Sequence, residues 1–200
     1  MRHSVLLAAV LSVVLVPGAA SAQYAQGGFL VGGQGGGGTE LVDAGWSVDM
    51  GYVIEVGDRH GPYLGGRYTF GLRQLRPDEQ GLRDRYGDGT GTGTVKGGGG
   101  TLYDTGGDIE IGYGIGVVRV YGFTGIHYLQ QFQNPATIAS GGEEVEVITR
   151  RRESISNGLG YGVHLRLTDT GALIAEHYRA GGEDGVMRIS GTRFGLRWAW

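Results

Sequence analysis

The sequence contains no cysteine among its 200 residues. A chain without cysteine has no disulfide scaffold, no thiolate metal site and no acylated cysteine to serve as a lipoprotein anchor. It also lacks a surplus of basic residues, since 17 lysines and arginines stand against 20 aspartates and glutamates. The resulting net charge of −3 provides no basic surface for a nucleic-acid partner.

A long hydrophobic run is missing as well. Arg2 and His3 precede an apolar stretch of 12 residues, Val5 to Val16, and the small residues Ala20 to Ala22 follow it. A transmembrane helix needs about 20 apolar residues, so this stretch is too short to span a bilayer. The charged start, apolar core and small-residue cleavage site predict a secretory signal peptide over residues 1–22. Residues 23–200 then form the mature chain, which we expect to be one domain.

Glycine is abundant, with 43 residues, and 11 tyrosines accompany it. No triplet period is present, which excludes collagen. Aromatic and β-branched residues are plentiful and the charges nearly balance, which argues against a disordered chain. The composition is that of a glycine-rich and tyrosine-rich β protein.

Alternation of apolar and polar residues marks the strands. It is clear over 46–56, 63–73, 108–115, 155–167 and 193–200, and weaker over 24–32, 117–130 and 172–180. The pattern leaves the faces of the three weaker segments unassigned, and a bulge in the second or third would explain their irregular phase. Long connections (33–43, 75–101, 131–154 and 181–185) alternate with short turns, and the glycines of the long ones are typical of flexible linkers. Eight strands joined in this way predict an all-β, antiparallel up-and-down barrel.

The residues on the two faces indicate which one is inside. The polar face of the clear strands carries many glycines and ten ionisable residues: Asp49, Glu55, Arg67, Arg73, Asp108, Glu110, His164, Arg166, Arg193 and Arg197. Arginine and glycine, with Lys96 the only lysine after residue 22, suit a crowded interior of paired charges better than a solvated surface. The other face is aliphatic, with Trp46, Tyr68, Trp198 and Trp200 near segment ends, where aromatic girdles of membrane barrels lie. We therefore predict a transmembrane barrel filled by a salt-bridge network, without an open pore.

The last eight residues carry a more specific pattern. Arg193, Gly195, Trp198 and Trp200 follow the order polar, any, glycine, any, any, apolar, any, aromatic. This order resembles the terminal assembly signal of bacterial outer-membrane barrels, although that signal usually ends in phenylalanine. The mature chain as a whole resembles the small eight-stranded barrels of the OmpA/OmpX type. The resemblance implies an outer-membrane location in a Gram-negative bacterium and folding by the barrel-assembly machinery, and it implies no single activity. We expect a monomer.

No catalytic, metal or cofactor site is predicted. Ser154 to Asn157 is similar to part of the His-x-Ser-Asn motif of the lipid A deacylases, but the histidine is missing. His164 lies eight residues beyond Ser156, about 26 Å along a strand, which is too far to activate the serine.

Arg150, Arg151 and Arg152 precede a strand at the long-loop side of the barrel. Arginine binds phosphate in a forked geometry, so these residues are candidates for contact with the phosphates of lipopolysaccharide. A solvated charge run is the alternative, because Glu143, Glu144, Glu146 and Glu153 surround them.

The predicted function is thus structural or interactive: an outer-membrane barrel that contributes to membrane integrity and makes surface contacts through long glycine-rich loops. Two alternatives stay open. One is a narrow channel. The other is a secreted soluble barrel that carries an apolar ligand, as lipocalins do, with Gly45 and Trp46 as a faint match to their glycine-x-tryptophan pattern.

Overall fold

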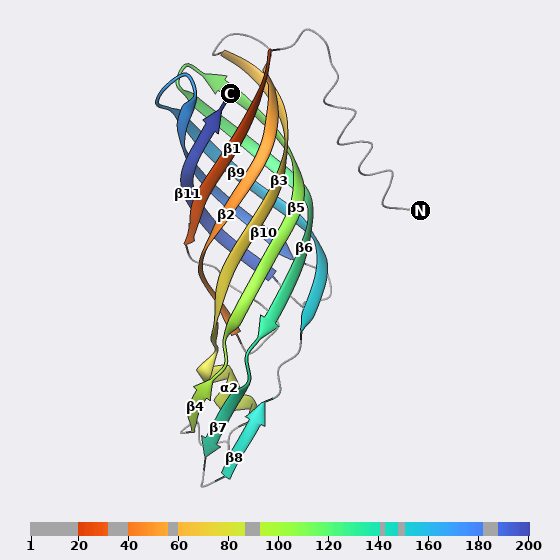
Figure 1. The fold of residues 1–200 in the computed structure, drawn as a ribbon, viewed down its shortest axis with the longest axis vertical. Helices are drawn as coiled ribbons and strands as arrows, with labels where there is room; N and C mark the ends of the chain where they lie inside the picture. The colour runs from red at the N-terminus through yellow and green to blue at the C-terminus, as the bar shows by residue number, and fades with distance from the viewer. Residues whose placement is uncertain are drawn as a thin grey trace, which may run out of the picture.

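The computed structural model describes residues 20–31, 40–55, 60–86, 93–140, 143–147, 151–181 and 188–200. The predicted signal peptide up to residue 19, and Arg150, lie outside these residues. Residues 20–22 of the predicted peptide continue the first strand. Figure 1 shows an elongated barrel with a smaller unit of sheet and helix beyond one of its ends.

The barrel has eight strands, each antiparallel to its neighbours. They are β1 (Ala20–Val31), β2 (Glu40–Glu55), β3 (His60–Pro77), β5 (Gly100–Ile115), β6 (Val118–Gln133), β9 (Arg152–Arg166), β10 (Gly171–Gly181) and β11 (Arg188–Ala199). Because β1 pairs with β11, the sheet closes. The predicted eight-stranded antiparallel barrel is confirmed.

The strand register sets the tilt of the strands. Following directly paired residues from Ala20 on β1 once around the wall returns to Leu30, ten positions further along the same strand. Eight strands with this stagger tilt by about 40° to the barrel axis and enclose an interior just wide enough for side chains to fill.

Two of the predicted flexible connections are instead structured. They contain helix α2 (Glu79–Tyr86) and a three-stranded sheet of β4 (Thr94–Gly97), β7 (Ala136–Ser140) and β8 (Glu143–Val147). Leu82, Ala136 and Ile138 are buried together between them. Gly97, Gly98 and Gly99 have φ values of 75°, 80° and 76°, a left-handed conformation that glycine adopts without strain. The segment is therefore a defined turn between β4 and β5 rather than a linker. No helix within the described ranges is long and apolar enough to cross a membrane.

The structure assigns the faces that the alternation left open. On β1 and β10 the even-numbered residues point inward, and on β6 the odd-numbered ones do. Neither β6 nor β10 has a bulge in its barrel pairings; the register shift of the barrel lies instead between Val42 and Gly45 on β2.

Large rings inside the barrel lie over glycines of the adjacent strand. Tyr63 faces Gly112, and Phe123 faces Gly160, in direct cross-strand pairs. A Cβ atom at Gly160 would lie 2.2 Å from Cζ of Phe123, and one at Gly112 would lie 2.5 Å from Cε1 of Tyr63. The narrow interior holds aromatic and guanidinium groups because the neighbouring positions carry no side chain.

Candidate functional site

Ten carboxylate and guanidinium side chains are buried inside the barrel among the residues that the structure describes. The arginines are Arg67, Arg73, Arg119, Arg193 and Arg197, and the acids are Asp49, Asp104, Asp108, Glu110 and Glu176. The five positive and five negative groups balance. An uncompensated charge in such an interior costs several kcal/mol, so this equality is a condition of stability.

Arg67 on β3 is the centre of the network. Its Nη1 lies 2.6 Å from Glu176 Oε1 and 3.7 Å from Asp49 Oδ2, and its Nε donates to Asp108 Oδ2 at 3.1 Å. Its Cζ lies 3.8 Å from the centre of the Phe123 ring. These partners come from β10, β2, β5 and β6, so one guanidinium ties opposite sides of the wall together.

Two arginines on β11 extend the network along the axis. Arg193 donates to both carboxylate oxygens of Asp49, at 2.9 and 2.6 Å, and also contacts Glu176. Arg197 binds Glu110 through both terminal nitrogens, at 3.1 and 3.0 Å. Two terminal nitrogens on one carboxylate give a forked, charge-assisted pair of the stronger kind.

Neutral side chains occupy the remaining hydrogen-bonding positions of these acids. Tyr121 donates to Glu176 at 2.6 Å, and Tyr63 and Tyr24 donate to Glu110 at 3.1 and 3.3 Å. Gln26 accepts from Arg197 Nε at 2.7 Å. The carboxylates are thus held by several donors each, which fixes their positions.

His127 lies on β6 with one ring nitrogen at each of two carboxylates. Its Nδ1 is 2.7 Å from Asp104 Oδ1 and its Nε2 is 3.1 Å from Asp108 Oδ1. Ser156 on β9 is paired with His127 in the register, but the buried Ser156 hydroxyl has no hydrogen-bond partner. Because both imidazole nitrogens face carboxylates, His127 does not act as a base toward the serine.

Arg73 departs from the predicted pairing with a carboxylate. It is completely buried, its Nη2 contacts the Tyr178 hydroxyl, and its Cζ lies 4.9 Å from the ring of that tyrosine. Its Nε and Nη1 have no hydrogen-bond partner. The residue lies in the interior as predicted, but its contacts are aromatic rather than ionic.

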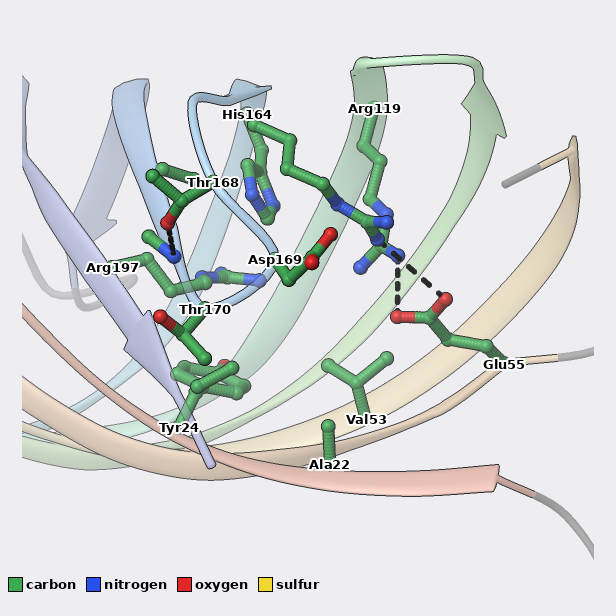
Figure 2. A pocket seen from close by; sticks show the side chains of 14 residues that line it. Ala22, Tyr24, Val53, Glu55, Arg119, His164, Thr168, Asp169, Thr170 and Arg197 are labelled. Carbon is green, nitrogen blue, oxygen red and sulfur yellow. Dashed lines mark hydrogen bonds and ion pairs between the residues drawn. The ribbon is translucent and has the colours of Figure 1, made fainter. Parts of the chain in front are cut away.

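The other three predicted interior residues lie toward the short-turn end of the barrel. His164 is buried, whereas Glu55 and Arg166 are partly exposed. Arg119 contacts Glu55, and Arg166 Nη2 lies 3.9 Å from Glu55 Oε2. These groups line a pocket of about 80 Å³ at this end, which Figure 2 shows from close by.

Toward the opposite end most interior side chains are apolar, although Arg73 and Gln131 are also buried there. Leu30, Val42, Leu75, Leu102, Leu129, Ala180 and Ile189 are all buried and belong to one hydrophobic cluster. A layer of this kind above the charged network fills the barrel toward the long loops.

The exterior is the reverse of the interior. Ile109, Ile111, Leu196 and other large apolar side chains point outward and are about 60% exposed, as are Trp198 and Trp200. Apolar side chains outside and ionised ones inside are the arrangement of a membrane barrel, and the opposite of a soluble ligand-carrying barrel. The prediction of Tyr68 as a girdle residue is wrong. Tyr68 is paired with Met50 and Gly107 near the middle of β3. The alternation predicts which face a residue is on, but not its position along the barrel axis.

Two of the three residues predicted to contact lipopolysaccharide, Arg151 and Arg152, are described, and they differ in exposure. Arg151 is exposed, forms a 2.6 Å ion pair with Glu153 and lies 5.1 Å from the centre of the Phe132 ring. Arg152 is partly buried.

The four residues of the C-terminal pattern all lie at the end of the chain that closes the barrel. Arg193 is in the interior, Trp198 and Trp200 are outside, and Gly195 pairs with Gly28 of β1. A Cβ at Gly195 would lie 2.1 Å from the Gly27 carbonyl oxygen, so the closing seam requires glycine there.

The sequence reasoning missed several interior residues: Gln26, Asp104, Arg119, His127 and Glu176. Four lie on strands with unassigned faces, and Asp104 lies beyond the predicted start of its strand. Ile174, Glu176 and Tyr178 share one face of β10. Glu176 could have been predicted to point inward if that face had been recognised as the interior one.

Comparison with solved structures identifies the class of fold. Ail, the attachment invasion locus protein of Yersinia pestis, in a crystal structure with the heparin analogue sucrose octasulfate, matches with a TM-score of 0.51 at 12% identity, covering 90% of this chain and 99% of that one. The N-terminal β-barrel domain of Pseudomonas aeruginosa OprF (TM-score 0.49, 12% identity, 90% and 97% covered) and Neisserial surface protein A (0.42, 15%, 89% and 95%) are also similar. No family profile and no curated protein matches the sequence.

The match to Ail establishes the fold as that of the eight-stranded outer-membrane barrels. Together with the apolar exterior described above, the match gives this chain the architecture of a transmembrane β-barrel, similar to those of outer-membrane proteins.

The charge network predicts a specific pattern of mutational costs. Arg67→Leu leaves four carboxylates within 3.9 Å without their shared cation, and we expect it to destabilise the barrel by about 3–5 kcal/mol. The double variant Arg67→Leu/Glu176→Leu restores the equality of charge and should cost less than Arg67→Leu alone. Equilibrium urea unfolding from lipid vesicles, followed by tryptophan fluorescence, measures both. Equal costs for the single and double variants would contradict the network.

Proposed function

We propose that this protein serves the outer membrane as a closed, non-conducting barrel that holds a small folded unit at the cell surface. The observation that carries the proposal is the filled interior. Buried charged side chains occupy the middle of the barrel and its short-turn end, and a mainly apolar layer lies between them and the long loops. Contributions to membrane integrity and surface contact fit such a barrel better than transport does.

The unit formed by α2, β4, β7 and β8 is the part suited to surface contact. It has its own buried cluster and continues the barrel at the long-loop end (Figure 1). In the OmpA/OmpX-type barrels that the chain resembles, long loops face the exterior of the cell, and this orientation is part of the proposal. The sucrose octasulfate in the Ail structure is a ligand of that protein. A sulfated saccharide is accordingly one class of surface partner to examine here.

The C-terminal pattern supports folding by the barrel-assembly machinery. Its glycine lies in the seam between β1 and β11, and its two tryptophans face outward, where lipid and assembly factors are reached first.

A conductance measurement distinguishes the closed barrel from the alternative of a narrow channel. Purified protein reconstituted in a planar lipid bilayer should show no unit conductance steps, because buried charged and apolar side chains fill the interior formed by the described strands. The heat-modifiable migration of the same preparation in gels confirms that the barrel is folded. Reproducible steps from folded protein would favour the channel and overturn the proposal.

Contact of residues 150–152 with lipopolysaccharide is a second part of the proposal. It is supported by the exposure of Arg151 beside the aromatic ring of Phe132, although Glu153 neutralises part of its charge. The variant Arg150→Gln/Arg151→Gln/Arg152→Gln should retain less lipopolysaccharide through purification than the parent. Arg83→Gln, which alters an exposed ion pair of α2, is a matched control. Unchanged retention in the triple variant would remove the idea.

A further inference from the structure

The pocket at the short-turn end of the barrel has the composition of an anion site. It is lined by inward-facing residues of β1, β2, β6, β9, β10 and β11 and by the turn between β9 and β10. Three guanidinium groups, from Arg119, Arg166 and Arg197, border it. Figure 2 shows Arg119 pointing toward Glu55, with the carboxylate of Asp169 drawn between this pair and the ring of His164.

Two acids line the pocket beside its three guanidinium groups. Glu55 contacts Arg119, and its Oε2 lies 3.9 Å from Arg166 Nη2. Arg197 is held from below by Glu110 and Gln26. Asp169 in the turn is the second acid of the lining. A guanidinium has five N–H donors, so Arg119 and Arg166 can each bind a further oxyanion in addition to Glu55.

His164 supplies the independent observation. Its ring lines the pocket, the residue is only 5% exposed, and its Nδ1 has no hydrogen-bond partner. A buried polar atom without a partner costs about 1–3 kcal/mol unless a ligand or water satisfies it. This nitrogen is therefore positioned to hydrogen-bond a ligand in the pocket.

We infer that this pocket binds a small soluble oxyanion, of phosphate or carboxylate size, between Arg119, Arg166 and His164. A volume of about 80 Å³ accommodates roughly five waters, or one such anion with part of its hydration. The lining side chains all belong to the interior of the barrel or to its turn, so the ligand comes from the aqueous phase on the short-turn side. Lipid headgroups surround the outside of the wall.

The test uses the full chain, folded in detergent micelles, with labelled histidine side chains. Two-dimensional ¹H–¹³C spectra follow the His164 ring, assigned with a His164→Asn sample, while sodium phosphate or sodium acetate replaces sodium chloride at constant ionic strength. We expect a saturable shift of the His164 resonance with phosphate or acetate.

Three variants make the test specific. Arg166→Gln removes one donor from a partly exposed position and should weaken binding about tenfold. Glu55→Gln removes the resident carboxylate and should tighten it. Arg179→Gln, on the exposed outer face of β10, should leave it unchanged.

Two results would overturn the inference. One is a non-saturating shift, or one equal in the parent and Arg166→Gln. The other is a shift of His164 that appears only when phosphatidylglycerol nanodiscs replace the micelles, and not with free phosphate or acetate, because the ligand would then be a lipid headgroup.

Discussion

The interior of an eight-stranded barrel is too narrow for bulk water, so each ion in it depends on a counter-ion from another strand. Here every buried arginine except Arg73 has a carboxylate partner on another strand, and Arg73 instead contacts Tyr178. The central guanidinium, Arg67, lies within 3.9 Å of acids on three other strands. Because the partners are distant in sequence, the network is complete only when the sheet has closed. Charge pairing in the core and closure of the wall are thus one event.

The same constraint explains the composition. Guanidiniums and aromatic rings are large, and the wall makes room for them with glycine on the adjacent strand, as at Gly112 beside Tyr63 and Gly160 beside Phe123. At the seam the backbones of Gly28 and Gly195 approach closely for a related reason. Because the charged side chains lie inside the barrel, aliphatic and aromatic residues form its outer surface, which only a bilayer solvates. Under the proposed function, the filled lumen leaves no transport path, and the folded unit at the loop end is the part available to partners.

The sequence alone was sufficient for the strand count, the antiparallel order and the assignment of the apolar face to the outside of the barrel. Each of these rests on local alternation and on which residue types share a face. It identified Asp49, Arg67 and Glu110 for the same reason. It failed where the alternation is equivocal. Glu176 and Ile174 share a face, and without the neighbouring strands no rule decides whether that face lines the interior or contacts lipid. Arg73 shows a second limit, since a predicted inward position does not specify its partner. The sheet of β4, β7 and β8 was missed because its strands have four or five residues, too few to establish a period.

Contact between the outward isoleucines and lipid is the claim on which the whole account depends, and spin labelling measures it directly. Because the sequence has no cysteine, single cysteines at Ile109 and Ile111 on β5, and at Val145 on β8 as the reference, each carry one label. In lipid vesicles, the labels at 109 and 111 should collide more with dissolved oxygen than with a water-soluble nickel chelate, and the label at 145 should do the reverse. Nickel accessibility at 109 and 111 equal to that at 145 would contradict the account.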